Sequence, residues 1–265
     1  MHLDAVDLPL LLAPNHGRGI RVATSSGSGS GSSIFPALRR LGLRSARDRI
    51  AGTALGCCLA VEHLTVELSH MGTAEWALIS QLSQLQTLAI HSCYGDTDAD
   101  VDEDGEALPL PQSLSSLTSL TNLDIQHSEF HRAMAQLPAV RKLRLWDPSD
   151  KSHAAAGWPL PEGPWLRNLE TLDIMHGQIG SIEAALRQAT RLHTLSVENC
   201  YWLRLQRHEL QLFLQLPLRR LTLSKHPEWD ERDDLPEPLW DEDTLWVVEK
   251  LRKALKPGVL CNSYI

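Results

Sequence analysis

Three residues of this 265-residue chain are of types that bind metal ions, and they occupy the same position in three copies of a repeated unit. His127, Asp147 and His176 each lie two residues after an apolar residue of that unit. On neighbouring strands about 4.8 Å apart, two imidazoles and a carboxylate at these places could meet around a metal ion. A row of polar side chains on a solvated rim is the other interpretation, and it needs no ligand.

A second row joins charges of opposite sign. Asp124, Arg144 and Asp173 occupy the middle of three consecutive units. Alternating carboxylate and guanidinium groups on adjacent strands stabilise strand pairing. The row therefore indicates a complementary surface rather than a pair of catalytic acids.

An acidic segment partly matches a calcium-binding loop. Asp100, Asp102 and Asp104 alternate before Gly105, as carboxylates and a tight turn do around a hard cation. Position twelve of such a loop needs a bidentate glutamate, and here it is Pro111. A solvated, self-repelling loop is the simpler interpretation.

Motifs of the common enzyme classes are absent from the sequence. It contains no phosphate loop, dinucleotide-binding glycine pattern, zinc peptidase motif or serine nucleophile elbow. We therefore expect a protein that is not an enzyme and has no cofactor. The net charge of −8 disfavours binding to nucleic acid and to anionic lipid.

The apolar segments and cysteines predict the compartment. Residues 8–13 are the longest apolar stretch near the start, far short of the roughly 20 residues of a membrane span. They also follow acids rather than bases, so we expect no signal peptide and no membrane contact. Five cysteines without a C-x-x-C pair predict buried thiols in the reducing cytoplasm.

These candidate residues take their places from an internal repeat. An apolar-x-x-Leu-x-apolar unit occurs eight times, starting at Leu38, Val61, Leu85, Leu120, Val140, Leu169, Leu192 and Leu218. Side chains alternate along a strand, so the central leucine and the second apolar residue after it point inward together. One unit cannot bury its leucines alone, whereas a stack of units can.

The repeat resembles that of the leucine-rich repeat family over about residues 34–226. Units 85–93 and 192–200 match best, because each ends in the cysteine of the family's strand signature. The resemblance implies an α/β solenoid shaped like a horseshoe, with parallel strands on the concave face and short helices or irregular turns on the convex face. Helical patterns over 74–82, 181–189 and 208–216 agree with this.

The chain divides into three segments. Residues 1–33 form an irregular N-terminal segment with a Gly/Ser linker at 24–33. The repeat domain, 34–226, contains the acidic insert 96–107, and an acidic loop and a helix make up 227–265. We expect that helix, over 241–255, to cap the last repeat, and a helix that docks a partner is the alternative.

The leading prediction is a scaffold that binds another protein on its concave face, as the resemblance implies. Trp, Met and Arg are enriched at the centres of interfaces, and Trp146 and Met175 are neighbours in one predicted column. The predicted contact residues are Asp124, Gln126, Arg144, Trp146, Asp173, Met175 and His176. In the alternative, Trp146 folds against the following turn at Pro148.

Other roles of the family remain open. A substrate-recognition subunit of an SCF-type ubiquitin ligase would need an F-box, and only residues 8–12 resemble the opening of one. That pattern does not continue, so we expect a fragmentary N-terminus. A cytoskeletal or ciliary assembly component is a further alternative.

A basic cluster lies near the first unit and consists of Arg39, Arg40, Arg44, Arg47 and Arg49. We expect these charges to protect the first strand from edge-to-edge aggregation. Binding of an acidic partner, or of the chain's own acidic insert, is the alternative.

Overall fold

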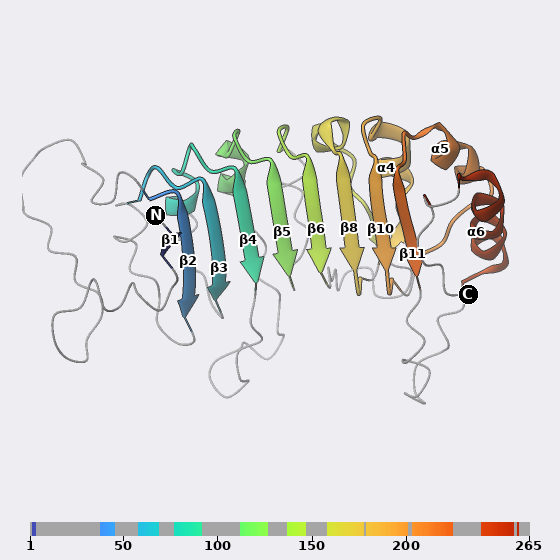
Figure 1. Cartoon of the computed structure of the whole chain (residues 1–265), viewed down its shortest axis with the longest axis horizontal. Helices are drawn as coiled ribbons and strands as arrows, with labels where there is room; N and C mark the ends of the chain where they lie inside the picture. The colour runs from blue at the N-terminus through green and yellow to red at the C-terminus, as the bar shows by residue number, and fades with distance from the viewer. Residues whose placement is uncertain are drawn as a thin grey trace, which may run out of the picture.

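The computed structural model describes residues 2–3, 38–45, 58–68, 77–91, 112–126, 137–146, 158–177, 179–200, 203–224, 240–256 and 259. Nine strands form one open sheet whose order follows the chain (Figure 1). They are β1 (His2–Leu3), β2 (Arg40–Ser45), β3 (His63–Leu68), β4 (Thr87–His91), β5 (Asn122–Gln126), β6 (Lys142–Trp146), β8 (Thr171–Met175), β10 (Thr194–Glu198) and β11 (Arg220–Ser224). All pairs are parallel, so the chain advances one strand per repeat in a solenoid-like α/β fold.

The central leucine of every unit lies in one column across the sheet. Strand pairing places these residues side by side: Leu41, Leu64, Leu88, Leu123, Leu143, Leu172, Leu195 and Leu221. None is more than 4% exposed. A shift of one residue would turn a whole strand's leucines to the solvent, so burial specifies the register. The eight strands and their alignment confirm the predicted repeat.

Backbone hydrogen bonds tie each repeat to the next where the strands begin. The carbonyl of the residue that directly precedes a strand accepts hydrogen bonds from the N–H groups of two consecutive residues of the next repeat, at 2.7–3.2 Å. The carbonyls that do so belong to Arg39, Glu62, Gln86, Thr121, Arg141, Glu170 and His193. This arrangement recurs at all seven junctions between the eight strands that follow β1 in the large sheet, whatever the length of the intervening segment.

Short helices pack against the buried face of the sheet. They include the 3-10 helices η1 (Gln112–Ser116) and η4 (Pro164–Asn168), and the α-helices α4 (Glu183–Gln188) and α5 (Glu209–Gln215). The helices predicted over 181–189 and 208–216 correspond to α4 and α5, and residues 77–79 form a helical turn within the predicted 74–82. Ile79, Leu186 and Phe213 place their side chains in the same core as the strand leucines.

One repeat contains elements that the sequence pattern does not predict. In the long unit after β6, β7 (Trp158–Pro159) pairs with β9 (Ile179–Ser181) of the next unit in a second, two-stranded parallel sheet. Trp165 of η4 is 1% exposed, and its indole N–H donates to the Pro161 carbonyl at 3.2 Å. The additional residues of this unit thus extend the core.

The helix predicted over 241–255 is α6 (Glu242–Ala254), which packs on α5 at the end of the sheet (Figure 1). Asp241 caps its first turn by accepting the Thr244 N–H at 2.8 Å. The Thr244 hydroxyl in turn accepts the Leu205 N–H at 2.8 Å, and the Val248 side chain is fully buried. The apolar face of α6 is therefore part of the protein's own core. None of the described helices is long and apolar enough to cross a bilayer.

Several predicted features lie outside the described residues: the Gly/Ser linker, residues 8–12, the acidic insert and Pro148. One prediction about the described part needs correction. β2 is not the first strand of the sheet, because His2 and Leu3 of β1 pair with Arg40 and Leu41. Protection of an open edge is therefore the wrong explanation for Arg40.

Replacing a central leucine should cost far more stability than replacing an exposed one. Leu172→Ala removes a fully buried side chain and should lower the free energy of unfolding by about 2–5 kcal/mol. Leu214 is 40% exposed, so Leu214→Ala should change it by only about 0.5 kcal/mol. Urea titration followed by circular dichroism measures both. Equal losses would contradict the assigned core.

Candidate partner-binding site

The predicted contact residues come together on the exposed face of the sheet. We call them the strand-face patch: Asp124, Gln126, Arg144, Trp146, Asp173, Met175 and His176. Six of them occupy two rows of paired positions on β5, β6 and β8, and the seventh directly follows β8. The sequence therefore predicted their adjacency correctly. Their role in binding remains a prediction.

Arg144 lies between two carboxylates in the first row. Its Nε is 2.9 Å from Asp173 Oδ2, and its terminal nitrogen is 3.7 Å from Asp124 Oδ2. The side chain remains 54% exposed. The two acids thus orient the guanidinium along the sheet without covering it, and N–H groups remain available on its solvent side.

Burial perturbs the electrostatics of Asp124. Desolvation raises the pKa of Asp124 above its ordinary value, and the nearby positive charge of Arg144 offsets only part of this effect. One carboxylate oxygen, Oδ1, is buried and accepts no hydrogen bond from the described residues. Asp124 therefore binds a proton more readily than a free aspartate does.

Trp146 is partly exposed and is braced from the side. Its ring centroid lies 5.3 Å from that of His176, and the two rings are tilted by 30°. His176 has a φ of 55°, in the left-handed region that histidine adopts more often than most residues. Its N–H donates to the Glu198 carbonyl at 2.9 Å, which fixes the turn and the ring it carries.

The next repeat forms the same turn. Asn199 follows β10 as His176 follows β8, has a φ of 57°, and donates its N–H to the Ser224 carbonyl at 2.8 Å. Its amide nitrogen lies 3.5 Å from His176 Nε2. Asn199 therefore extends the bracing of Trp146 by one repeat. Sequence reasoning missed this residue, although its position in the repeat could have indicated it.

The two cysteines in the described part of the chain, Cys58 and Cys200, are both buried, as the sequence predicted. Cys200 Sγ lies 3.6 Å from the Glu198 carbonyl and 4.0 Å from that of Ile174. Burial raises the pKa of the Cys200 thiol to about 12. The thiol is therefore protonated at neutral pH, and its role is to pack beneath the turn rather than to react.

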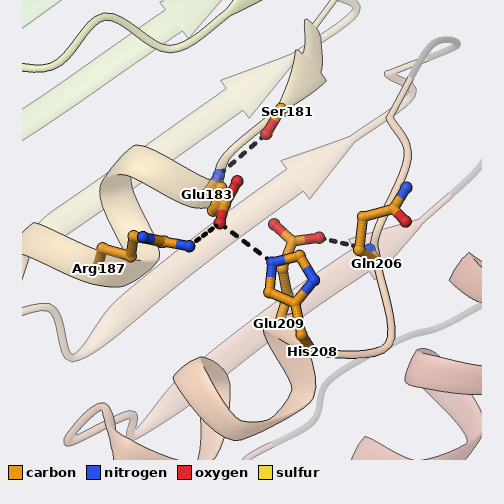
Figure 2. Close-up of polar contacts among 6 residues, drawn as sticks. All are labelled: Ser181, Glu183, Arg187, Gln206, His208 and Glu209. Carbon is orange, nitrogen blue, oxygen red and sulfur yellow. Dashed lines mark hydrogen bonds and ion pairs between the residues drawn. The ribbon is translucent and has the colours of Figure 1, made fainter.

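A second polar cluster joins α4 to α5 (Figure 2). Glu183 Oε1 lies 2.5 Å from an Arg187 nitrogen and 3.1 Å from His208 Nε2. The bond from His208, followed by that from Arg187, lowers the pKa of Glu183. The Ser181 hydroxyl accepts the Glu183 N–H at 3.2 Å. These contacts connect the starts of two consecutive helices at the surface.

Glu209 lies beside this cluster but is only 1% exposed. Its carboxylate accepts the Gln206 N–H at 2.5 Å, as a glutamate does when it reaches back to cap its own helix (Figure 2). Desolvation raises the pKa of Glu209, and Oε1 has no hydrogen-bond partner among the described residues. Two carboxylates and an imidazole could serve acid–base chemistry. Here their bonds are those of helix capping and helix pairing.

The described residues contain no group of three His, Cys, Asp or Glu side chains that could hold a metal ion. Of the predicted metal row, His127 and Asp147 lie outside the described part of the chain, and His176 contacts Trp146 and Asn199. The half calcium loop at Asp100–Gly105 lies outside it as well. The sequence favours a solvated rim and a solvated loop over metal sites at these places, and the described residues test neither alternative.

The chain matches no protein-family model and no curated protein sequence. A solved structure, that of a leucine-rich repeat protein of Leptospira interrogans, is similar with a TM-score of 0.31 and 14% identity. The alignment covers 73% of this chain and 69% of that one. The assignment of a fold like that of leucine-rich repeats rests on the eight aligned strands and their shared leucine column, described above.

Glu209 should make stability depend on pH. Because its pKa is raised by folding, the folded protein holds this proton more tightly than the unfolded chain does. Its contribution is therefore present in acid and is lost as the pH rises from the ordinary glutamate value through the raised pKa.

Glu209→Gln keeps an oxygen for the Gln206 N–H and removes the titration. We compare the free energies of unfolding of the variant and of wild type at two pH values. The variant minus wild-type difference should be more favourable to the variant at neutral pH than near the ordinary pKa of glutamate. Urea titrations at the two pH values measure this difference. A difference that is the same at both would contradict the raised pKa.

Proposed function

We propose that this protein is a non-enzymatic scaffold without a cofactor that binds another protein through the strand-face patch. In this proposal the strands line the concave side of a horseshoe. The observation that carries it is the partly exposed indole of Trp146, which contacts the His176 ring and lies two residues along β6 from Arg144. An aromatic side chain beside an arginine is the composition typical of binding hot spots.

The arrangement of the patch supports binding without large rearrangement. Trp146 and Met175 supply apolar area, while Arg144 lies beside them with its orientation set by Asp173 at 2.9 Å. Side chains that are already ordered lose little conformational entropy when a partner binds. A fitting partner presents an apolar side chain to Trp146 and a hydrogen-bond acceptor, such as a carboxylate, to Arg144.

The paired position beyond Met175 extends this surface. Glu198 of β10 lies next to Met175, and its carboxylate accepts a hydrogen bond from the Ser196 hydroxyl at 2.5 Å. The patch therefore has an acidic border on the side of β10. A partner that places a basic residue there would complement it, whereas a uniformly acidic partner would be repelled.

Loss of the patch should remove the partner. We expect Trp146→Ala with Met175→Ala to weaken binding by about 2 kcal/mol or more, because truncated hot spots typically cost this much. The measurement is affinity capture from lysate, followed by calorimetry with the identified and purified partner. The identity of the partner would also distinguish two alternative roles of this protein, a ubiquitin ligase subunit and a cytoskeletal or ciliary component.

The matched control is His63→Ala with Thr65→Ala, on the same face of the sheet but on β3. It should bind as wild type does. Equal binding by wild type and by the Trp146 and Met175 variant, with both folded, would show that the strand-face patch is not the interface.

A further inference from the structure

The edge of the sheet at which the strands begin is basic, although the whole chain carries a net charge of −8. Six cationic side chains gather there over β6, β8, β10 and β11, and all are exposed: Arg141, Lys142, Arg167, Arg191, Arg219 and Arg220. This is the upper edge of the sheet in Figure 1. It is distinct from the strand-face patch, which lies farther along the strands on their exposed face.

Few acids balance these charges. At the paired strand-start positions of these four strands, the one acidic residue is Glu170, which lies 3.6 Å from Arg141 and 3.9 Å from His193. Exposed pairs of this kind contribute little stability and are readily exchanged. Lys142 and Arg167 form no ion pair with any residue that the structure describes, and the same holds for both arginines at the start of β11.

Two adjoining hollows open on this edge. One, of about 310 Å³, is lined by Thr121, Pro138, Ala139, Arg141 and Asn168. The other, of about 560 Å³, is lined by Arg167, Asn168, Gln188, Thr190 and Arg191. Asn168 borders both, so the two hollows adjoin, and arginines line each of them. We call the two hollows together the depression.

Asn168 holds the depression in shape. Its amide nitrogen donates to the Pro138 carbonyl at 2.7 Å, and its oxygen accepts from the Arg191 guanidinium at 3.3 Å. The backbone of the edge is fixed as well, because the Arg141 and Glu170 carbonyls each accept two N–H bonds from the next repeat. The cations thus project from a rigid support.

We infer that this basic edge is a second docking site, which binds an extended acidic segment of a partner protein. Four neighbouring strands span about 14 Å, which an extended peptide crosses in about five residues. Glutamates or aspartates of such a segment would reach Arg167 and Arg191 at the depression, and arginine pairs with carboxylates in a bidentate geometry. The site does not depend on the strand-face patch.

A protein segment fits this edge better than a nucleic acid does. Single-stranded nucleic acids stack their bases on aromatic side chains, and none of the described residues that line the hollows is aromatic. Glu170 interrupts the row of cations, and the chain as a whole is acidic, so a long polyanion of uniform charge would be repelled. A short acidic segment confines its charges to the length of the basic edge.

The test is fluorescence anisotropy with the full chain and a labelled octaglutamate peptide. We expect binding that weakens as salt is added, and Arg167→Gln with Arg191→Gln should weaken it by about tenfold or more. The control for charge loss is Arg204→Gln with Lys256→Gln, at two exposed positions away from the depression. It should bind within about twofold of wild type, and circular dichroism confirms that both variants fold.

Each result decides for or against the inference. Trp146→Ala should bind the octaglutamate peptide as wild type does, so failure of the strand-face proposal would leave this site intact. No salt-dependent binding, or equal loss in the two charge variants, would overturn the inference. Tighter binding of a single-stranded DNA oligonucleotide of matched charge would also overturn it, in favour of nucleic acid.

Discussion

The bond pattern between repeats is the constraint on which the rest of the molecule depends. One carbonyl at each junction accepts two N–H groups of the following repeat, and the leucine column beneath prevents any slip. The hydrogen bonds set where each strand begins, while burial sets which face each side chain occupies. Together they convert position in a repeat into position in space. Two side chains that are far apart in the sequence therefore lie side by side when they occupy the same position in neighbouring repeats.

Two surfaces follow from this single constraint. On the strand face, Trp146 and Arg144 become neighbours of residues about 30 positions away, such as Asp173 at 2.9 Å from the guanidinium. At the starting edge, Arg167 and Arg191 line the same hollow. The first surface combines apolar area with charges of both signs, and the second is almost purely cationic. One protein could therefore engage two chemically different partners, or two segments of one partner.

The strands, their register and the two rows of the patch could be predicted from the sequence, because alternation and the repeat determine them locally. The pairing of β7 with β9 could not, since it joins two segments that the repeat does not contain. The contact of Trp146 with His176 depends on a left-handed turn, which apolar periodicity does not show. The basic edge was hidden for another reason. Net charge averages over the chain, whereas the fold separates the charges.

The longest spacing between units, 35 residues from Leu85 to Leu120, leaves Leu88 paired with Leu123 in the same alignment as elsewhere. Closing a longer loop costs little, since each doubling of length adds only about 0.6 kcal/mol. Loops of this scaffold can therefore lengthen over evolution without moving any residue of the sheet. The ends of each loop stay at the same place in the sheet. New binding elements can therefore be added at chosen sites, by natural variation or by grafting, without moving the existing surfaces.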